Sequence, residues 1–147
     1  MDQLTEKLIL QPDHWRKMLA DVKGRTMEEA CGLVGGKDQT SMAVFPVTNI
    51  LHSRSRYRMD PEEQIKIFNQ LDENQWELLA IYHSHLQGRG DPSSIDIAEA
   101  MYPGVIYIIW FRLNTLWECK GYLIDKNIVN QVPILILEDD QTIRQIG

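Results

Sequence analysis

The sequence predicts an α+β domain with one central sheet flanked by helices. Segments rich in β-branched and aromatic residues, typical of strands, are mixed with amphipathic segments typical of helices along the 147 residues. Most of the expected strands lie close together in the second half of the chain, which favours the α+β class. The chain has neither an internal repeat nor a linker, so we expect a single domain over residues 1–147.

The first half of the chain is expected to contain two helices. Asp13 is expected to cap a helix over residues 13–22, and Gly24 is expected to stop it. Residues 60–74 are a stronger helix prediction, because Asp, Pro and two Glu residues begin the segment in the order that favours a helix start. The strands expected in this half are residues 7–10, 30–34 (a strand or a short buried helix), 41–45 (ended by Pro46) and 57–59.

The second half is expected to contain one short helix among strands. Residues 76–84 have the composition of a strand, and a loop rich in Gly, Arg and Asp follows them. A helix is expected to open at Pro92-Ser93-Ser94, to run to Ala100, and to be closed by Pro103-Gly104. The remaining expected strands are residues 105–111, 116–124 and 132–137, with an acidic, frayed surface segment at 138–140. No apolar run approaches the roughly 18 residues of a membrane span.

Charge and the N-terminal residues exclude several functional classes. The net charge of −6, from 21 acidic and 15 basic residues, argues against a protein that binds nucleic acid through its phosphates. The one basic cluster, Arg54, Arg56 and Arg58, is expected to alternate along an exposed strand face. Residues 1–6 lack the features of a signal peptide, so we expect a cytoplasmic protein that does not contact a membrane.

The two cysteines, Cys31 and Cys119, are expected to be reduced, as is usual in the cytoplasm. Neither lies in a C-x-x-C pair, so the cysteines alone cannot hold zinc. Each is interpreted as a small buried side chain rather than a nucleophile.

Two of the four histidines are spaced like metal ligands. On a strand, positions i and i+2 point to the same face, so His83 and His85 would project together. A catalytic zinc site needs three protein ligands, and Asp96, in the expected helix after the loop, is the candidate for the third. An H-x-H pair alone is more often two ordinary histidines, whereas the whole set, H-x-H, seven residues, Ser, two residues and Asp, favours a metal site. His14 and His52 are interpreted as surface residues.

A hydrolytic metal site also needs a base for the attacking water and a donor for the developing oxyanion. Glu29 lies just before an apolar, glycine-containing run and could supply the base. Ser93, one helical turn before Asp96, could supply the donor.

Three segments together carry a known motif: Glu29-Ala30-Cys31-Gly32-Leu33-Val34-Gly35-Gly36, His83-Ser84-His85 and Pro92-Ser93-Ser94-Ile95-Asp96. They resemble the JAMM (MPN-plus) family of zinc metalloproteases, and most closely its short prokaryotic members. The family motif is a glutamate upstream, then H-x-H, seven residues and S-x-x-D; Glu29, not Glu28, has the family spacing to Gly32. One departure is Leu86, where the family commonly has proline, and it is expected to loosen the following loop without removing a ligand.

The resemblance implies a role for each residue of the motif. His83, His85 and Asp96 would bind one Zn²⁺ ion, with a water molecule in the fourth position. Glu29 would be the general base that activates this water and then protonates the leaving amine. Ser93 would donate a hydrogen bond to the tetrahedral oxyanion.

The resemblance also implies a fold, a reaction and a partner. The family has one curved central mixed sheet flanked by helices (an α/β/α-like form of the α+β class). It hydrolyses the peptide or isopeptide bond after the C-terminal Gly-Gly of a ubiquitin-like or sulfur-carrier protein. We expect this extended tail to bind by strand addition beside the site. The oligomeric state stays open.

Three other functions are alternatives to a JAMM-type peptidase. The strongest is a non-catalytic scaffold of the same fold that binds partner proteins, although inactive relatives characteristically lose ligands. A zinc nucleobase deaminase would need H-x-E or C-x-E with P-C-x-x-C, which the sequence lacks. A thermolysin-like protease would need H-E-x-x-H on a helix, which is also absent from the sequence.

Overall fold

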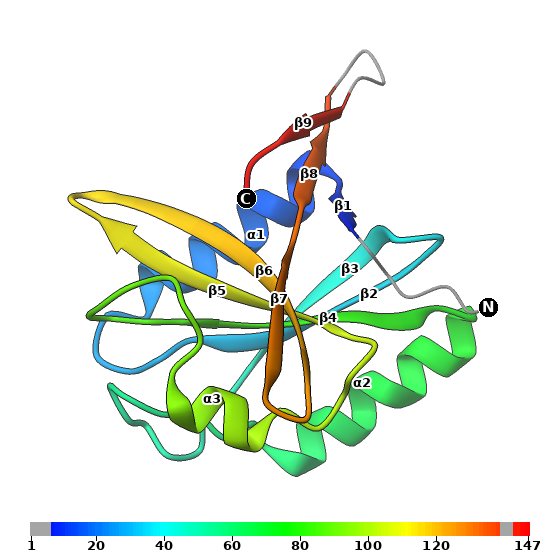
Figure 1. The fold of residues 1–147 in the computed structure, drawn as a ribbon. Helices are drawn as coiled ribbons and strands as arrows, with labels where there is room; N and C mark the ends of the chain where they lie inside the picture. Colours follow the sequence, from blue (N-terminus) through cyan, green and yellow to red (C-terminus); the bar gives the residue numbers. More distant parts are fainter. Residues whose placement is uncertain (1–6, 139–142) are drawn as a thin grey trace.

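The computed structural model describes residues 7–138 and 143–147. Within these residues, nine strands form one mixed sheet in the order β7-β6-β5-β4-β2-β3-β1-β8-β9 (Figure 1). The strands are β1 (Leu8–Leu10), β2 (Cys31–Lys37), β3 (Thr40–Val47), β4 (Glu77–Ser84), β5 (Ile106–Leu113), β6 (Leu116–Asp125), β7 (Ile128–Val132), β8 (Ile134–Leu137) and β9 (Ile143–Gln145). The described part of the chain also forms the helices α1 (Pro12–Gly24), α2 (Pro61–Asn74) and α3 (Ser94–Glu99).

The helices cover the two faces of the central strands. Met18 of α1 packs in a hydrophobic cluster that includes Tyr82 of β4. Ile67 of α2 and Ile97 of α3 pack in a second cluster, which includes Ile81 of β4. Neighbouring side chains of β4 therefore point to opposite faces, as the pleat of a strand requires. Figure 1 shows α1 above β2–β5 and the other two helices below them.

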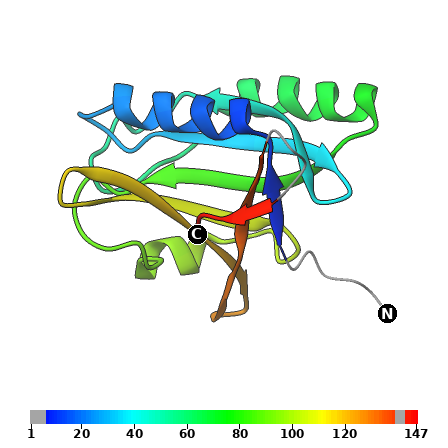
Figure 2. The same ribbon diagram turned by 90° about the horizontal axis from the view of Figure 1, so that it is seen from above.

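The sheet is strongly curved because two consecutive strands lie far apart in its order. β7 pairs with β6, whereas β8, after the single residue Pro133, pairs with β1 in parallel. Figure 2 shows β1 and β8 running across the direction of β2–β5. Ile134 of β8 packs so closely over Gly121 of β6 that a Cβ atom on this glycine would lie 3.0 Å from it. The predicted α+β class with one curved mixed sheet flanked by helices is confirmed.

The two long helices begin in different ways. Asp60 caps α2 as expected, and its Oδ1 accepts a hydrogen bond from the Glu62 N–H (2.9 Å). The prediction that Asp13 caps α1 is wrong, because Gln11 is the N-cap and Pro12 occupies the first turn. Proline fits that position since its missing N–H would have no helical partner there.

The strand expected over residues 41–45 is present as β3, but its predicted end at Pro46 and the strand expected over residues 57–59 were wrong. β3 continues through Pro46, which pairs opposite Gly32 of β2. The proline is tolerated because β1 pairs with β3 only near Thr40, so the other side of β3 has no ladder at residue 46. Residues 57–59 contribute only an isolated bridge between Asn49 and Met59.

The basic residues Arg54, Arg56 and Arg58 lie in a loop and not along a strand. The loop is organised by the buried side chain of Asn49, whose Nδ2 donates to the Arg56 carbonyl and whose Oδ1 accepts from the Arg58 N–H (both 3.1 Å). An asparagine that replaces backbone partners favours a turn over a strand.

The expected strand over residues 132–137 is two strands, because Pro133 cannot donate to a ladder and the chain changes partners there. β9 was not predicted. The acidic segment at 138–140 lies largely outside the described residues, and Glu138 accepts a hydrogen bond from Arg144 of β9 (2.7 Å). Both cysteines are buried and free, as expected. No helix of the described residues has the length and apolar character needed to cross a membrane.

Candidate active site

The two histidines of the H-x-H pair come from the end of β4, the strand between β2 and β5. His83 is paired with Cys31 on one side and Ile109 on the other, and its side chain is 1% exposed. The His85 N–H donates to the Trp110 carbonyl (2.8 Å), which extends the strand geometry by one residue. Both rings consequently project to the same face, with their Nε2 atoms 3.1 Å apart.

Asp96 reaches these rings from the first turn of α3. Ser93 and Asp96 form a capping box, in which the Ser93 Oγ accepts from the Asp96 N–H (3.0 Å) and the Asp96 Oδ2 accepts from the Ser93 N–H (2.9 Å). The same Oδ2 atom lies 3.3 Å from the Nε2 of His83 and 3.1 Å from that of His85. The cap therefore fixes the carboxylate at the end of β4.

The three side chains fit a tetrahedral metal ion. His83, His85 and Asp96 are the one group among the described residues whose donor atoms lie close enough together to hold a metal. Their mutual distances of 3.1–3.3 Å resemble the edge of about 3.4 Å that follows from zinc–ligand distances of about 2.0–2.1 Å. Two neutral imidazoles and one carboxylate are also a donor set of catalytic zinc sites.

Contacts behind the rings orient the two histidines. The Nδ1 of His85 lies 2.8 Å from the Arg89 carbonyl, and an N–H there leaves the Nε2 lone pair free for a metal. The His83 ring stacks on Tyr57, with centroids 4.6 Å apart. Its Nδ1 atom is buried and has no hydrogen-bond partner among the described residues.

Glu29 lies two residues before the start of β2 and is 5% exposed. Its N–H donates to the Ser53 carbonyl (2.8 Å), and its carbonyl accepts from Asn49 (3.1 Å). Among the described residues, its Oε1 atom is buried without a partner. The neighbouring Glu28 instead contacts His52 (2.8 Å), which is not part of the candidate metal group. The structure therefore brings Glu29, and not Glu28, to the histidines.

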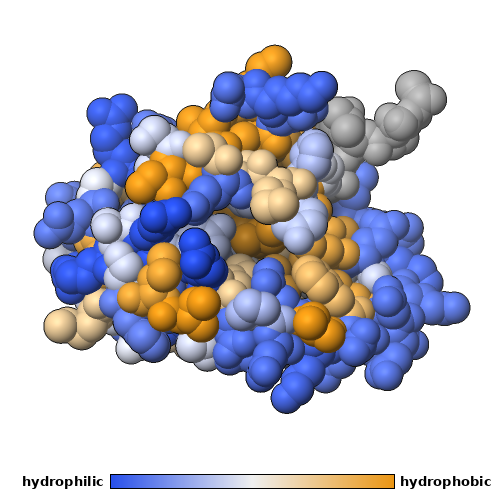
Figure 3. All heavy atoms as spheres, turned by 90° about the horizontal axis from the view of Figure 1, so that it is seen from below, coloured by the Kyte–Doolittle hydropathy of each residue, from blue (hydrophilic) through white to orange (hydrophobic). Residues whose placement is uncertain are grey.

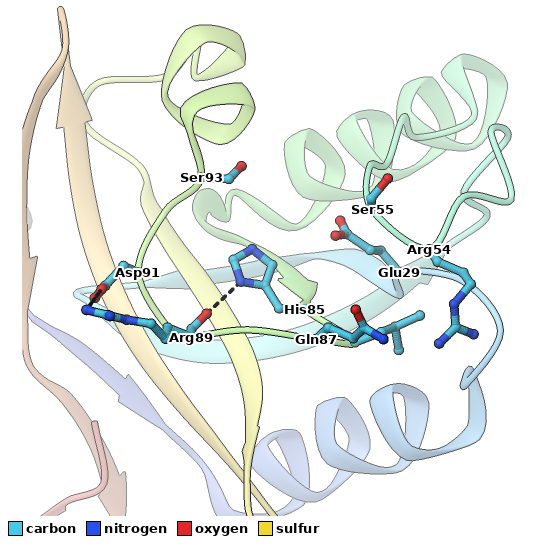
Figure 4. Close-up of a pocket in the computed structure, with 9 residues that line it drawn as sticks. Glu29, Arg54, Ser55, His85, Gln87, Arg89, Asp91 and Ser93 are labelled. Carbon is cyan, nitrogen blue, oxygen red and sulfur yellow. Dashed lines mark hydrogen bonds and ion pairs between the residues drawn. The ribbon is translucent and has the colours of Figure 1, made fainter.

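A pocket of about 380 Å³ connects these groups. In Figure 4, His85 lies in the middle of the pocket; Glu29 and Arg54 lie on one side of it, and Ser93 and Arg89 lie on the other. All five candidate residues of the sequence motif are thus brought to one place, with the predicted base and the predicted oxyanion donor on opposite sides of His85.

The site shifts its titratable groups in opposite directions. Burial raises the pKa of Glu29 to about 8, which brings its titration close to neutral pH. Burial would also raise the pKa of Asp96, but hydrogen bonds from His83 and His85 outweigh it and hold that pKa far below its usual range. Burial lowers the pKa of His83. Two carboxyl groups with divergent pKa values are typical of sites where one is a permanent anion and the other moves protons.

Several neighbours of the site were not predicted. Asn49 and Tyr57 hold Glu29 and His83 from the loop between β3 and α2, and Arg54 of the same loop lines the pocket. Ser84 is buried between the histidines in sequence, and its Oγ accepts from the Ala30 N–H (2.8 Å), next to Glu29. The sequence offers little signal for these residues: Ser84 adjoins the two motif histidines, and Asn49 is of a residue type that favours turns. His14 and His52 lie outside the metal group.

Comparison with known proteins identifies the family of the chain. Residues 11–122 match the family of prokaryotic homologs of the JAB domain. The chain is 29% identical to the desampylase of Pyrococcus furiosus over 87% of its own length and 90% of the relative's. It is 28% identical to the CysO-cysteine peptidase of Mycobacterium tuberculosis over 89% of its length and 92% of the relative's.

Solved structures share the fold. Protein DSY2949 of Desulfitobacterium hafniense superposes with a TM-score of 0.80 at 30% identity, over 90% of this chain and 94% of that one. AF2198, a JAB1/MPN domain protein of Archaeoglobus fulgidus, gives a TM-score of 0.56 at 15% identity, over 89% and 97% of the two chains. The prediction of a JAMM-type peptidase is thereby confirmed at the level of enzyme class, and the chain belongs to the prokaryotic homologues of the JAB domain.

Proposed function

We propose that the protein is a zinc-dependent peptidase or isopeptidase that cleaves the bond after the C-terminal Gly-Gly tail of a ubiquitin-like or sulfur-carrier protein. One observation carries this proposal: the donor atoms of His83, His85 and Asp96 converge within 3.3 Å of one another beside the pocket that His85 and Glu29 line. The names of relatives, a CysO-cysteine peptidase and a probable TtuB-protein conjugate cleaving protease, support the substrate class.

Zinc held by these three side chains would supply a Lewis acid that lowers the pKa of a water molecule to about 7. Glu29 takes a proton from the attacking water and delivers it to the leaving amine. Its position suits this work because the carboxyl has no competing hydrogen bond at Oε1 among the described residues. A raised pKa, near the working pH, lets one carboxyl both accept and donate a proton.

Ser93 stabilises the oxyanion from the other side of His85 (Figure 4). Its Oγ already accepts from the Asp96 N–H (3.0 Å), which leaves the hydroxyl proton for another acceptor. A preorganised donor of this kind lowers the barrier because it stabilises charge that develops only in the transition state.

The substrate tail binds beside a loop that borders the pocket, and not along a strand edge. β4 is paired on both sides, so it offers no free edge for the expected strand addition. The backbone of residues 86–92, which follows β4 and borders the pocket, is the available partner for an extended tail. Apolar side chains gather in the middle of the face that carries α2 and α3 (Figure 3), and Ile95, Met101 and Tyr102 are exposed in and after α3. Such a surface suits the globular part of a protein substrate.

Zinc content tests the metal site first. Elemental analysis of the purified chain is expected to give about one zinc per chain. Asp96→Ala is expected to lose the metal, because it removes one of three ligands. Asp72→Ala, which removes an exposed acid of α2, is the matched control and keeps it. Absence of zinc after reconstitution would contradict the proposal and favour the scaffold alternative.

Cleavage tests the substrate class. CysO and TtuB, each extended by one residue beyond the tail or joined through the tail to a lysine side chain, are incubated with the three proteins and analysed by mass spectrometry. We expect release of at least one of these groups by the unmodified protein and by Asp72→Ala, and none by Asp96→Ala. Zinc binding with no cleavage of any substrate would overturn the proposed reaction.

A further inference from the structure

We infer that Arg54 binds the free carboxylate of the leaving group, so that the preferred substrate is a protein tail that carries a single C-terminal amino acid. This inference rests on the proposed function and specifies the bond that is cleaved. It distinguishes a C-terminal amino-acid adduct from an isopeptide bond to a lysine side chain of a second protein.

The direction of the substrate follows from the two sides of the pocket. Glu29 must reach the leaving nitrogen in order to protonate it, so the leaving group lies on the Glu29 side of His85. Arg54 lies on that side as well, whereas Ser93 lies on the other (Figure 4). Arg54 is therefore the arginine that lines the pocket on the side of the leaving group, and its side chain would turn toward His85 to bind a charge there.

Arg54 is free to bind an anion. Its Nη1 donates to the Thr26 carbonyl (3.1 Å) and lies 4.0 Å from the Met27 sulfur. Within residues 7–138 and 143–147, no carboxylate lies within ion-pair distance of its guanidinium, although two other arginines near the site have such partners. Arg89 pairs with Asp91 (3.3 Å), and Arg56 pairs with Glu99.

The surroundings of Arg54 also suit a carboxylate. Ser55 and Gln87 line the same pocket and offer a hydroxyl and an amide as neutral donors. The loop that bears Arg54 is held beside the site, because Ser53 accepts from the Glu29 N–H (2.8 Å) and Asn49 donates to the Glu29 carbonyl (3.1 Å). A guanidinium matches the planar geometry of a carboxylate and can bind it through two parallel hydrogen bonds.

The covalent structure of the two substrate types decides which of them this site prefers. In an α-linked amino acid, the leaving nitrogen and the carboxylate are attached to the same carbon atom. In an isopeptide, the leaving nitrogen ends the four-carbon stem of lysine, and no carboxylate lies close to it. A cation near the leaving nitrogen therefore favours the first type and gains nothing from the second.

The test uses three forms of CysO and of TtuB, which differ only beyond the tail. The added group is alanine with a free carboxylate, alaninamide, or lysine linked through its side-chain nitrogen. Values of kcat/KM are measured for the unmodified protein and for Arg54→Gln, Arg54→Lys and Arg58→Gln. Arg58 is an exposed residue of the same loop that does not line the pocket, so it is the matched control. Binding of the alanine and alaninamide forms is measured separately in Glu29→Gln, with and without Arg54→Gln.

We expect the unmodified protein to cleave the carboxylate form at least about tenfold faster than the amide or lysine forms, as a charge-assisted hydrogen bond predicts. Arg54→Gln should reduce cleavage of the carboxylate form to the rate of the amide while leaving the amide nearly unchanged. Arg54→Lys should keep part of the preference, and Arg58→Gln all of it. The same preference is expected in the dissociation constants measured with Glu29→Gln.

Equal cleavage of the three forms by the unmodified protein would overturn the inference and leave the proposed function in place. A uniform loss of all activities in Arg54→Gln would also overturn it, because a structural role lowers every rate alike. Failure to cleave any form would overturn the proposed function, and the inference with it.

Discussion

The two faces of β4 carry two polar clusters, each partly buried, that differ in how completely they are hydrogen-bonded. On the α1 face, the Tyr82 hydroxyl donates to Asp21 (2.7 Å). Arg25 donates to the same carboxylate (2.8 and 2.9 Å) and to the carbonyl groups of Cys31 (2.9 Å) and Val47 (2.8 Å). This cluster joins α1 to β2 and β3, and each of these donors has its acceptor.

On the opposite face, one residue further along the strand, the polar groups are not satisfied by one another. Among the described residues, the buried Oε1 of Glu29 and Nδ1 of His83 lack partners. The Asp96 Oδ2 atom is shared by two imidazoles and a backbone N–H. Leaving a buried polar group without a partner costs about 1–3 kcal/mol.

The difference indicates separate purposes for the two clusters. A saturated network stabilises the fold and has no capacity left for a ligand, whereas an unsaturated one retains donors and acceptors for a metal, a water molecule and a substrate. Substitutions on the two faces should therefore affect different quantities.

The largest effect is expected for Glu29→Gln. The amide has nearly the same shape but cannot carry the proton, so kcat should fall by about 10²–10⁴-fold. Zinc content should be unchanged, since Glu29 is not among the three ligands, and thermal stability should not fall. Full activity in this variant would remove Glu29 from the mechanism.

A smaller loss of activity is expected for Ser93→Ala. Removing one oxyanion donor lowers kcat by about 10²-fold or more in comparable sites. The change also removes the N-cap of α3, which is worth about 0.5–2 kcal/mol. Ser93→Thr separates the two roles, because it keeps a hydroxyl for both; if it were as inactive as Ser93→Ala, the hydroxyl would not be the donor.

On the other face, Tyr82→Phe should change stability and leave the chemistry intact. It removes the donor to Asp21 in a buried network, so the free energy of unfolding should fall by about 1–3 kcal/mol. Urea denaturation of the metal-free protein measures this. Loss of zinc or of kcat in the folded variant would show that the two faces are coupled and do not act separately.

The smallest effect expected concerns the pH dependence of stability in the metal-free protein. Burial raises the pKa of Glu29 from 4.5 to about 8, so between these values the folded chain holds a proton that the unfolded chain has released. Stability must then decrease as pH rises from about 4.5 to 8, by on the order of 1 kcal/mol once water access to the pocket is allowed for. Urea denaturation at pH 5 and pH 8 should show this decrease in the unmodified protein and a smaller one in Glu29→Gln.

The sequence predicted which side chains converge better than it predicted the strands around them. His83, His85 and Asp96 were recognisable because a strand and a helix start each impose a fixed geometry on nearby residues. The loop that bears Arg54 and Tyr57 has no such periodicity, and its shape depends on the buried Asn49, whose partners are distant in sequence. Local patterns do not report such long-range hydrogen bonds.

The errors at the prolines have a related cause. Pro46 lies within β3 because the neighbouring strand on that side ends early, and Pro133 divides one expected strand because its two halves join different partners. Both outcomes depend on which strands lie alongside, and that information is absent from the segment itself. The helix starts were predicted more closely than the strand ends. For α1 the predicted cap was Asp13, whereas the observed cap is Gln11, two residues earlier.

The pairing of β1 with β8 also determines which part of the sheet can form last during folding. Leu8 pairs with Ile134, so this contact closes a loop that contains nearly all of the described chain. During synthesis, β1 has to wait for its neighbour until the last strands have left the ribosome, whereas residues 29–96 of the site are already available. Pairing across such a sequence separation carries a large loop-closure entropy and slows folding. The segment that closes the curved sheet thus sets the time at which the nascent protein becomes fully folded.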